Sequence, residues 1–210
     1  MAIKEMEHSK FSKIEISNTF DFKIMQSNDF SVKLDTDEGF MKNVDIHQDG
    51  DKLKVHHSHH ISWMFRHTRP RITITMPVIK ELRLTGAVQG EVIGFKSKED
   101  FSLEMDGASR VLIDLQAVKT DIRVRGACTV EAKGSAQNLI VDVNGACTLE
   151  LEDFAVKEAA IRLNGASNCK AQVNGRLDAR LGGVSNLGLK GEPTIGDIRT
   201  TGMAKLSKIT

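Results

Sequence analysis

Short runs in which apolar and polar residues alternate cover much of this chain, as in "RITITMP" from Arg71 and "SLEMDG" from Ser102. Alternation with a period of two is typical of β-strands with one buried face, because successive side chains point to opposite sides. The sequence has 17 glycines and 3 prolines, and it lacks long stripes with the 3.6-residue period of an amphipathic helix. The pattern predicts an all-β protein.

The alternating runs recur around a glycine that returns every 18 to 21 residues. Apolar residues stand two and four positions before it, and again four and six positions after it, which is the strand period on both sides of a corner. A period of ~19 residues with glycine corners is typical of one coil of a parallel β-helix. Parallel crossovers are almost always right-handed. We therefore predict a right-handed single-stranded parallel β-helix of about seven coils over residues 80–210. The repeated glycines are Gly86, Gly107, Gly126, Gly145, Gly165, Gly183 and Gly202.

Two of the coils are nearly identical, "VRGACTVEAKG" from Val124 and "VNGACTLELED" from Val143. Cys128 and Cys147 occupy equivalent positions in them, in a column of small and medium side chains. Packing of the thiols at a tight corner explains this column, although the strand spacing also allows a disulfide between neighbouring coils. Three cysteines, an odd number, do not indicate a secreted disulfide framework, and these columns offer too few ligands for zinc.

The first third of the chain lacks the glycine repeat but still has the alternation of strands, for example "FSKIEIS" and "FDFKIMQ". The segment "QDGDK" from Gln48 predicts a hairpin turn. An open coil exposes apolar core and unpaired strand edges, so solenoids need caps. We expect residues 1–79 to form an antiparallel β cap that is continuous with the solenoid of residues 80–210 in one structural unit.

The charge balance excludes some partners. With 29 Lys plus Arg against 28 Asp plus Glu, the chain is unlike proteins that neutralise nucleic-acid phosphates or carry a polybasic membrane patch. No stretch approaches the ~20 apolar residues of a membrane span. The N-terminal segment "MAIKEMEHSKFSKIEIS" lacks the apolar core of a signal peptide. The sequence as given predicts a cytoplasmic protein, with the cell surface or secretion as the alternative if a leader was removed.

Histidines concentrate in "KVHHSHHISWMFRHTRPR" from Lys54. On a strand, His57 and His59 share one face, and His47 could join them across a hairpin centred on Gly50 to bind zinc, nickel or copper. A solvated loop between two strands is the alternative. A third interpretation is a partner-binding tip, because Trp63, Met64 and Phe65 offer an apolar contact surface. No cofactor is predicted.

A column of charged residues stands three positions before each glycine. Its signs alternate through the first five members, which supports strand register, and the last three members are all arginine. Arg162, Arg180 and Arg199 therefore lack alternating acids and are candidates for binding a partner. Stacking alone explains the alternation, so we do not predict an enzyme; "GAS" corners lack the strand–turn–helix context of a nucleophile elbow. The column reads Arg83, Glu104, Arg123, Asp142, Arg162, Arg180 and Arg199.

The run "PRITITMPVIKELRLTGAV", followed by repeated "GAS" and "GAC" coils, resembles the bacterial head GIN domain family of putative auto-transporter adhesins. The N-terminal strands also fit, so the resemblance runs from about Phe11 to the end of the chain. It implies a right-handed single-stranded parallel β-helix that is similar in appearance to bactofilins, and it brings no catalytic residues. This sequence departs from the family in having no visible export signal.

Two functions follow as hypotheses. The first is a non-catalytic β-solenoid that serves as an adhesion or scaffold module and binds a protein, a glycan or another copy of itself. The second is a metal- or ligand-responsive binding module that uses the histidine-rich loop, residues 56–67. The short C-terminal end offers little cover for the last coil, so a homo-oligomer could complete it.

Overall fold

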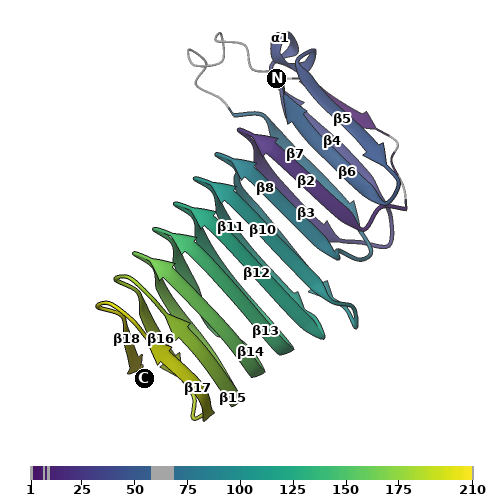
Figure 1. The fold of residues 1–210 in the computed structure, drawn as a ribbon. Coiled ribbons are helices and arrows are strands. Elements are labelled where there is room, and N and C mark those ends of the chain that lie inside the picture. The colour runs from purple at the N-terminus through teal and green to yellow at the C-terminus, as the bar shows by residue number, and fades with distance from the viewer. Residues whose placement is uncertain (1, 7, 9, 58–68, 210) are drawn as a thin grey trace.

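The computed structural model describes residues 2–6, 8, 10–57 and 69–209, and it shows an elongated stack of strands (Figure 1). Strands make up 72% of the chain, and in the described part 18 of them form one continuous sheet. One short helix, α1 (Glu38–Met41), lies there beside the N-terminal end of the stack. No helix among the described residues is long and apolar enough to cross a bilayer. The predicted all-β solenoid is confirmed.

The repeat region folds into parallel rungs, each with one strand before a glycine corner and one after it. In the middle of the molecule the strands continue from one rung into the next, so β13, β14 and β15 each contribute to two ladders. The elements are β8 (Glu81–Gly86), β9 (Gln89–Lys96), β10 (Phe101–Gly107), β11 (Arg110–Gln116), β12 (Lys119–Gly126), β13 (Thr129–Gly145), β14 (Thr148–Gly165), β15 (Asn168–Leu181), β16 (Asn186–Lys190), β17 (Thr194–Thr200) and β18 (Lys205–Lys208).

Glycine is required at the corners for two reasons that act together. The backbone at Gly126 has a φ of +99°, a conformation that disfavours side chains. A Cβ at this residue would also lie less than 3.0 Å from the carbonyl oxygen of Gly107 on the preceding rung, which is closer than real Cβ atoms approach. Gly107 and Gly126 are direct register partners, so each corner stacks on the previous one.

The apolar columns predicted around the glycines do face inward. Side chains of the columns that contain Ile122 and Val124 pack between the two ladders and are almost fully buried up to the last rung, where Ile198 is half-buried and Thr200 is exposed. Burying apolar surface contributes roughly 25 cal/mol per Å², so these columns supply the main stabilisation along the whole rod. The first residue after each glycine lies on the outside instead, and two of them, Val184 and Met203, are exposed large apolar side chains.

The number of coils and the cap differ from the prediction. The solenoid has about six turns, where about seven coils were predicted. The N-terminal third also contributes parallel strands: β2 (Lys13–Asn18) and β6 (Lys52–His57) in the first ladder, β3 (Asp21–Gln26) and β7 (Arg71–Met76) in the second. The antiparallel pairings among the described strands all involve β1 (Ala2–Met6), β4 (Ser31–Thr36) or β5 (Val44–Asp49).

The spatial order of these N-terminal rungs is not their order in the chain. Strand β2 lies between β6 and β8, and β3 lies between β7 and β9. The rung that comes first in the sequence is thus inserted between the second and the third. Hydrogen bonds of β2 and β3 to both neighbours join the N-terminal third to the repeat region without a break.

The two ends of the rod are different. At the N-terminal end, β1, β4 and β5 continue the sheet with antiparallel strands (Figure 1). At the C-terminal end, β17 pairs only with β15 and β18 only with β16 among the described strands. Ile195 and Met203 on this last rung are 52% and 70% exposed. The last rung therefore leaves strand edges and apolar side chains uncovered.

Candidate functional site

The outer side of the first ladder carries one continuous line of charged side chains, here called the charged column. The strand register places each member directly beside the next, and the N-terminal rungs extend the predicted line by two residues, Glu15 and Lys54. Because β2 is inserted between β6 and β8, the alternation of sign continues across the permuted rungs. The column now reads Lys54, Glu15, Arg83, Glu104, Arg123, Asp142, Arg162, Arg180 and Arg199.

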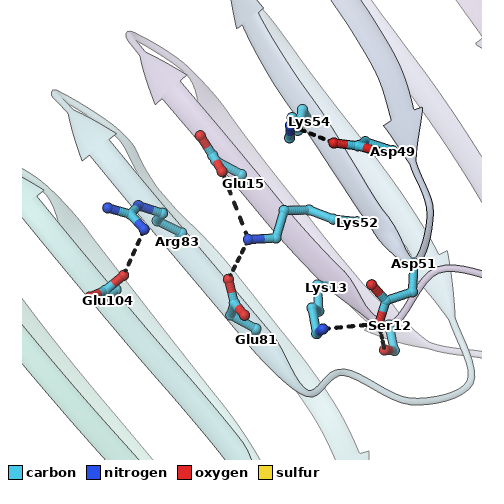
Figure 2. Close-up of polar contacts among 10 residues, drawn as sticks. All are labelled: Ser12, Lys13, Glu15, Asp49, Asp51, Lys52, Lys54, Glu81, Arg83 and Glu104. Carbon is cyan, nitrogen blue, oxygen red and sulfur yellow. Dashed lines mark hydrogen bonds and ion pairs between the residues drawn. The ribbon is translucent and has the colours of Figure 1, made fainter.

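At its N-terminal end the charged column is tied into a network of ion pairs (Figure 2). The Arg83 guanidinium lies 3.0 Å from the Glu104 carboxylate on the next rung. In the neighbouring column, the Nζ atom of Lys52 lies 2.7 Å from Glu81 and 4.0 Å from Glu15. Surface pairs of this kind contribute little energy one by one. As a network they favour the correct register and leave few unpaired charges for a partner.

Further pairs hold the hairpin of β5 and β6 at this end. Lys54 donates to the carboxylate of Asp49 at 2.9 Å, and Lys13 lies 3.1 Å from Asp51 at the turn. The hydrogen bond and charge of Lys54 lower the pKa of Asp49, and the hydrogen bond from Lys13 lowers the pKa of Asp51. Both carboxylates therefore stay ionised as cation partners.

The C-terminal end of the charged column has a different character. Arg162, Arg180 and Arg199 follow one another in register on three rungs, and we call them the arginine track. Asp197 lies 3.2 Å from Arg199 and 3.7 Å from Arg180, so one carboxylate pairs with two guanidinium groups. Within the part of the chain that the structure describes, no carboxylate forms an ion pair with the exposed side chain of Arg162. The track thus has unsatisfied positive charge and free guanidinium donors.

An open recess of about 380 Å³ lies next to the arginine track on the same face. Its floor includes Ile140 and Ala160, which are register partners and interrupt an otherwise polar column. Ionic side chains border it, with Arg176 hydrogen-bonded to Asp178 at 3.1 Å. This arrangement combines a small apolar floor with charged walls beside a row of arginines.

The histidines of the predicted metal site do not come together as expected. His57 points into the core, where it is 3% exposed and contacts Phe20 and Phe40, and its Nε2 atom accepts a hydrogen bond from the Thr19 amide. His47 points outward from β5. The two side chains therefore lie on opposite sides of the hairpin. In the register of β5 and β6, the residue beside His57 is Val44 and not His47.

On the outer face, His47 lies close to His56 and to a carboxylate that the sequence analysis did not predict. Asp45 is the direct cross-strand partner of His56, and ligand atoms of Asp45, His47 and His56 all lie within 4.8 Å of one another. The signal was present in the sequence, since the turn at Gly50 and Asp51 fixes the register and alternation places Asp45 on the face of His47. The other residues predicted here, His59, Trp63, Met64 and Phe65, lie outside the described residues.

The repeated cysteines are free and buried. Their thiols donate to the corner carbonyl of the previous rung: Cys128 to Gly107 at 3.5 Å and Cys147 to Gly126 at 3.4 Å. Ser167 makes the same bond to Gly145 at 3.0 Å, which explains why serine and cysteine share this column. Burial raises the pKa of both thiols, so they remain protonated and unreactive at neutral pH.

Comparisons with known proteins agree on the fold. The family model described as "Putative auto-transporter adhesin, head GIN domain" matches residues 10–193. A putative adhesin from Bacteroides fragilis superposes with a TM-score of 0.92 at 18% identity, covering 99% of this chain and 96% of its own. A putative lipid binding protein from Parabacteroides distasonis has a TM-score of 0.74 at 16% identity, with 100% and 96% covered. A putative adhesin from Parabacteroides merdae has a TM-score of 0.72 at 16% identity, with the same coverage. No curated protein matches. At these identities the structural neighbours show the fold alone.

Proposed function

The chain belongs to the head GIN domain family of putative auto-transporter adhesins, and from this premise we propose that it is a non-catalytic adhesion module that binds an anionic partner through the arginine track. The family supports an adhesion-like role in general terms. The identity of the partner class is our own step, and it rests on the charge distribution along the outer face of the first ladder.

The observation that carries the proposal is the row of Arg162, Arg180 and Arg199 with Asp197 as its sole acidic partner among the described residues. Adjacent strands are about 4.8 Å apart, so the track presents one guanidinium per rung along the axis of the rod. Guanidinium groups bind carboxylates, sulfates and phosphates through paired N–H donors. A linear polyanion that runs parallel to the axis, such as an acidic glycan, fits this spacing.

The rest of the face supports binding rather than catalysis. Arg123 and Asp142 are register partners in the alternating part of the column. Arg123 hydrogen-bonds Asp121 at 2.8 Å, and Asp142 accepts from Asn144 at 3.0 Å. These groups are engaged as structural partners along the sheet.

An adhesion role places the protein at the cell surface or outside the cell. The family description supports this location, and nothing supports the cytoplasmic location predicted from the N-terminal residues. A surface location also suits the composition of the track, because acidic glycans are common components of cell surfaces and secretions.

Self-association is a second candidate function, and it rests on a separate observation. The last rung leaves one edge of β17 and one edge of β18 without a partner among the described strands, and Ile195 and Met203 are exposed beside them. Free strand edges pair readily with other strands. Two copies that met at this end would cover both edges.

The test of the main proposal compares variants within one column. Binding to immobilised heparin and polygalacturonate, with dextran as the neutral control, is measured for Arg162→Ala/Arg180→Ala and for Arg83→Ala/Arg123→Ala. Each double variant removes two arginines from the same face. We expect the first to lose at least about tenfold in affinity, equivalent to ~1.4 kcal/mol, and the second to bind like the parent.

Binding of the parent protein to either polyanion should weaken as the salt concentration is raised, because exposed charge contacts weaken as ionic strength rises. Equal losses in both double variants would mean that binding follows net charge rather than the arginine track. If the parent protein bound neither heparin nor polygalacturonate, the result would contradict the proposed partner class.

A further inference from the structure

We infer that Asp45, His47 and His56 form a binding site for a divalent transition-metal ion, most suitably Zn²⁺, on the outer side of the β5–β6 hairpin. The site is separate from the arginine track, since β5 and β6 lie at the end of the rod opposite to β17 (Figure 1). It goes beyond the adhesion function and does not depend on it.

The three side chains converge on one point. The Oδ2 atom of Asp45 lies 3.1 Å from Nδ1 of His47 and 3.5 Å from Nε2 of His56, so a single oxygen faces both imidazoles. The two rings stand perpendicular, with centroids 5.8 Å apart. One ligand atom from each residue lies within 4.8 Å of the other two.

These separations match those in a tetrahedral zinc site. With Zn–N and Zn–O bonds of about 2.0 to 2.2 Å, two ligand atoms of a tetrahedron are roughly 3.3 to 3.5 Å apart. Both contacts of Asp45 lie near this value. The ligand atoms of the third pair, His47 and His56, lie within 4.8 Å of each other, and rotation of either imidazole can shorten this separation.

The backbone holds the ligands at this spacing before any ion binds. Asp45 and His56 are direct antiparallel partners, and His47 follows two positions after Asp45 on the same face of β5. Strand β6 is fixed on its other side by β2. Inward packing of His57 and Val55 keeps His56 directed outward. The cost of ordering the ligands is therefore low, which favours binding.

The electrostatics of the hairpin also allow a cation. His47 faces Lys54 across the strands, but Lys54 is paired with Asp49 at 2.9 Å. The local balance of Asp45, Asp49 and Lys54 is thus one negative charge. Two neutral imidazoles and one carboxylate suit zinc, and three protein ligands leave the fourth coordination position for water or for a ligand from a partner.

An adjoining open recess of about 540 Å³ gives access to the site. Its lining contains His47 and His56, with Lys54 from β6 and with Glu15 and Ser17 from the neighbouring β2. An ion can therefore enter from solvent, and a second ligand can reach it, without any rearrangement of the strands.

The experiment is titration of the full chain with Zn²⁺ by calorimetry, followed by Co²⁺ substitution to read the coordination geometry from the visible spectrum. We expect one equivalent with micromolar affinity and a tetrahedral Co²⁺ spectrum. His47→Ala, His56→Ala and Asp45→Asn should each weaken binding at least about tenfold. Circular dichroism checks that the variants keep the parent fold.

Two matched controls separate this site from the rest of the chain. Asp51→Asn removes an exposed carboxylate at the turn of the same hairpin, and His59→Gln/His60→Gln/His67→Gln removes the three histidines that follow His57 in the 56–67 region. Both should bind Zn²⁺ like the parent. Loss of binding in the triple variant, unchanged binding in His47→Ala or His56→Ala, or no parent binding tighter than about 1 mM would each overturn the proposal.

Discussion

The guanidinium of Arg83 lies 3.0 Å from the carboxylate of Glu104 on the adjacent rung. Glu104 is also the register partner of Arg123, so it stands between two arginines in the alternating part of the charged column. Opposite charges that face each other across strands are favourable, and like charges there are unfavourable. The column therefore contributes to register as well as to surface charge.

Glu104→Arg should place three arginines in a row and destabilise the fold by about 0.5 to 1 kcal/mol. Urea unfolding measures this loss, and the loss should shrink in 1 M salt because salt screens exposed charges (the Debye length is about 3 Å at that ionic strength). Ser102→Arg is the matched control on the same strand, since Ser102 stands between Glu81 and Asp121. It should be neutral or stabilising; equal losses for the two variants would show that sign does not matter here.

The stacked corners give a second prediction. Gly126→Ala would add a Cβ that lies less than 3.0 Å from the Gly107 carbonyl oxygen, on a backbone with positive φ. Because the obstacle is backbone on the preceding rung, it cannot move away, and we expect a loss of more than about 3 kcal/mol in the free energy of unfolding. Thermal and urea unfolding both report it.

The control for this prediction shares the backbone conformation without the close approach. Gly94 has a φ of +74°, and a Cβ there would meet nothing within 4 Å. Gly94→Ala should therefore cost only the conformational penalty, about 1 to 2 kcal/mol. If both alanine variants lost the same amount, positive φ alone would explain the recurrence of glycine at the corners of this chain.

Cys169 gives a prediction about alkaline pH. Complete burial raises the pKa of its thiol to about 12, from an ordinary value of 9.0. The folded state keeps this proton where the unfolded state loses it, so the stabilisation is complete below about pH 9 and is lost as pH rises toward 12. Unfolding free energy should fall more steeply between about pH 9 and 11 in the parent than in Cys169→Ala. Parallel pH profiles would show that the thiolate is tolerated in the core.

The repeat region could be predicted from the sequence because its determinants are local. Each coil has its own glycine and its own inward apolar pairs, such as Ile122 and Val124, and repetition makes the signal strong. The N-terminal rungs could not be predicted in the same way. Their strand order, with β2 between β6 and β8, depends on which distant edge pairs with which. No residue pattern within Lys13–Asn18 marks that insertion.

Both candidate sites depend on alternation along single strands. The arginine track follows from counting back from each glycine, and the structure adds Asp197, which stands two positions before Arg199 and also lies near Arg180. The structure does not bring His47 and His57 together. The apolar alternation of β6, in which Leu53, Val55 and His57 all turn inward, leaves His56 on the outer face beside Asp45.

The uncovered C-terminal rung leads to the last prediction. Ile195 and Met203 are exposed on the final rung, and both ladders end there among the described strands. We expect the parent protein to associate at high concentration through this end, since edge pairing and apolar burial would both be gained. Sedimentation velocity over a range of concentrations measures the association. The double variant Ile195→Lys/Met203→Lys should remain monomeric, because lysines at an edge prevent pairing with another strand.

Val118→Lys is the control for that variant, because Val118 is also an exposed apolar residue, 41% accessible, but lies between β11 and β12 in the middle of the rod. It should leave the association unchanged. Monomers of the parent at all concentrations would rule out the end as an interface between copies. Association lost equally in both variants would assign it to general surface hydrophobicity. Association lost only when the last rung is altered would mean that the open end of the solenoid, rather than its faces, joins the copies.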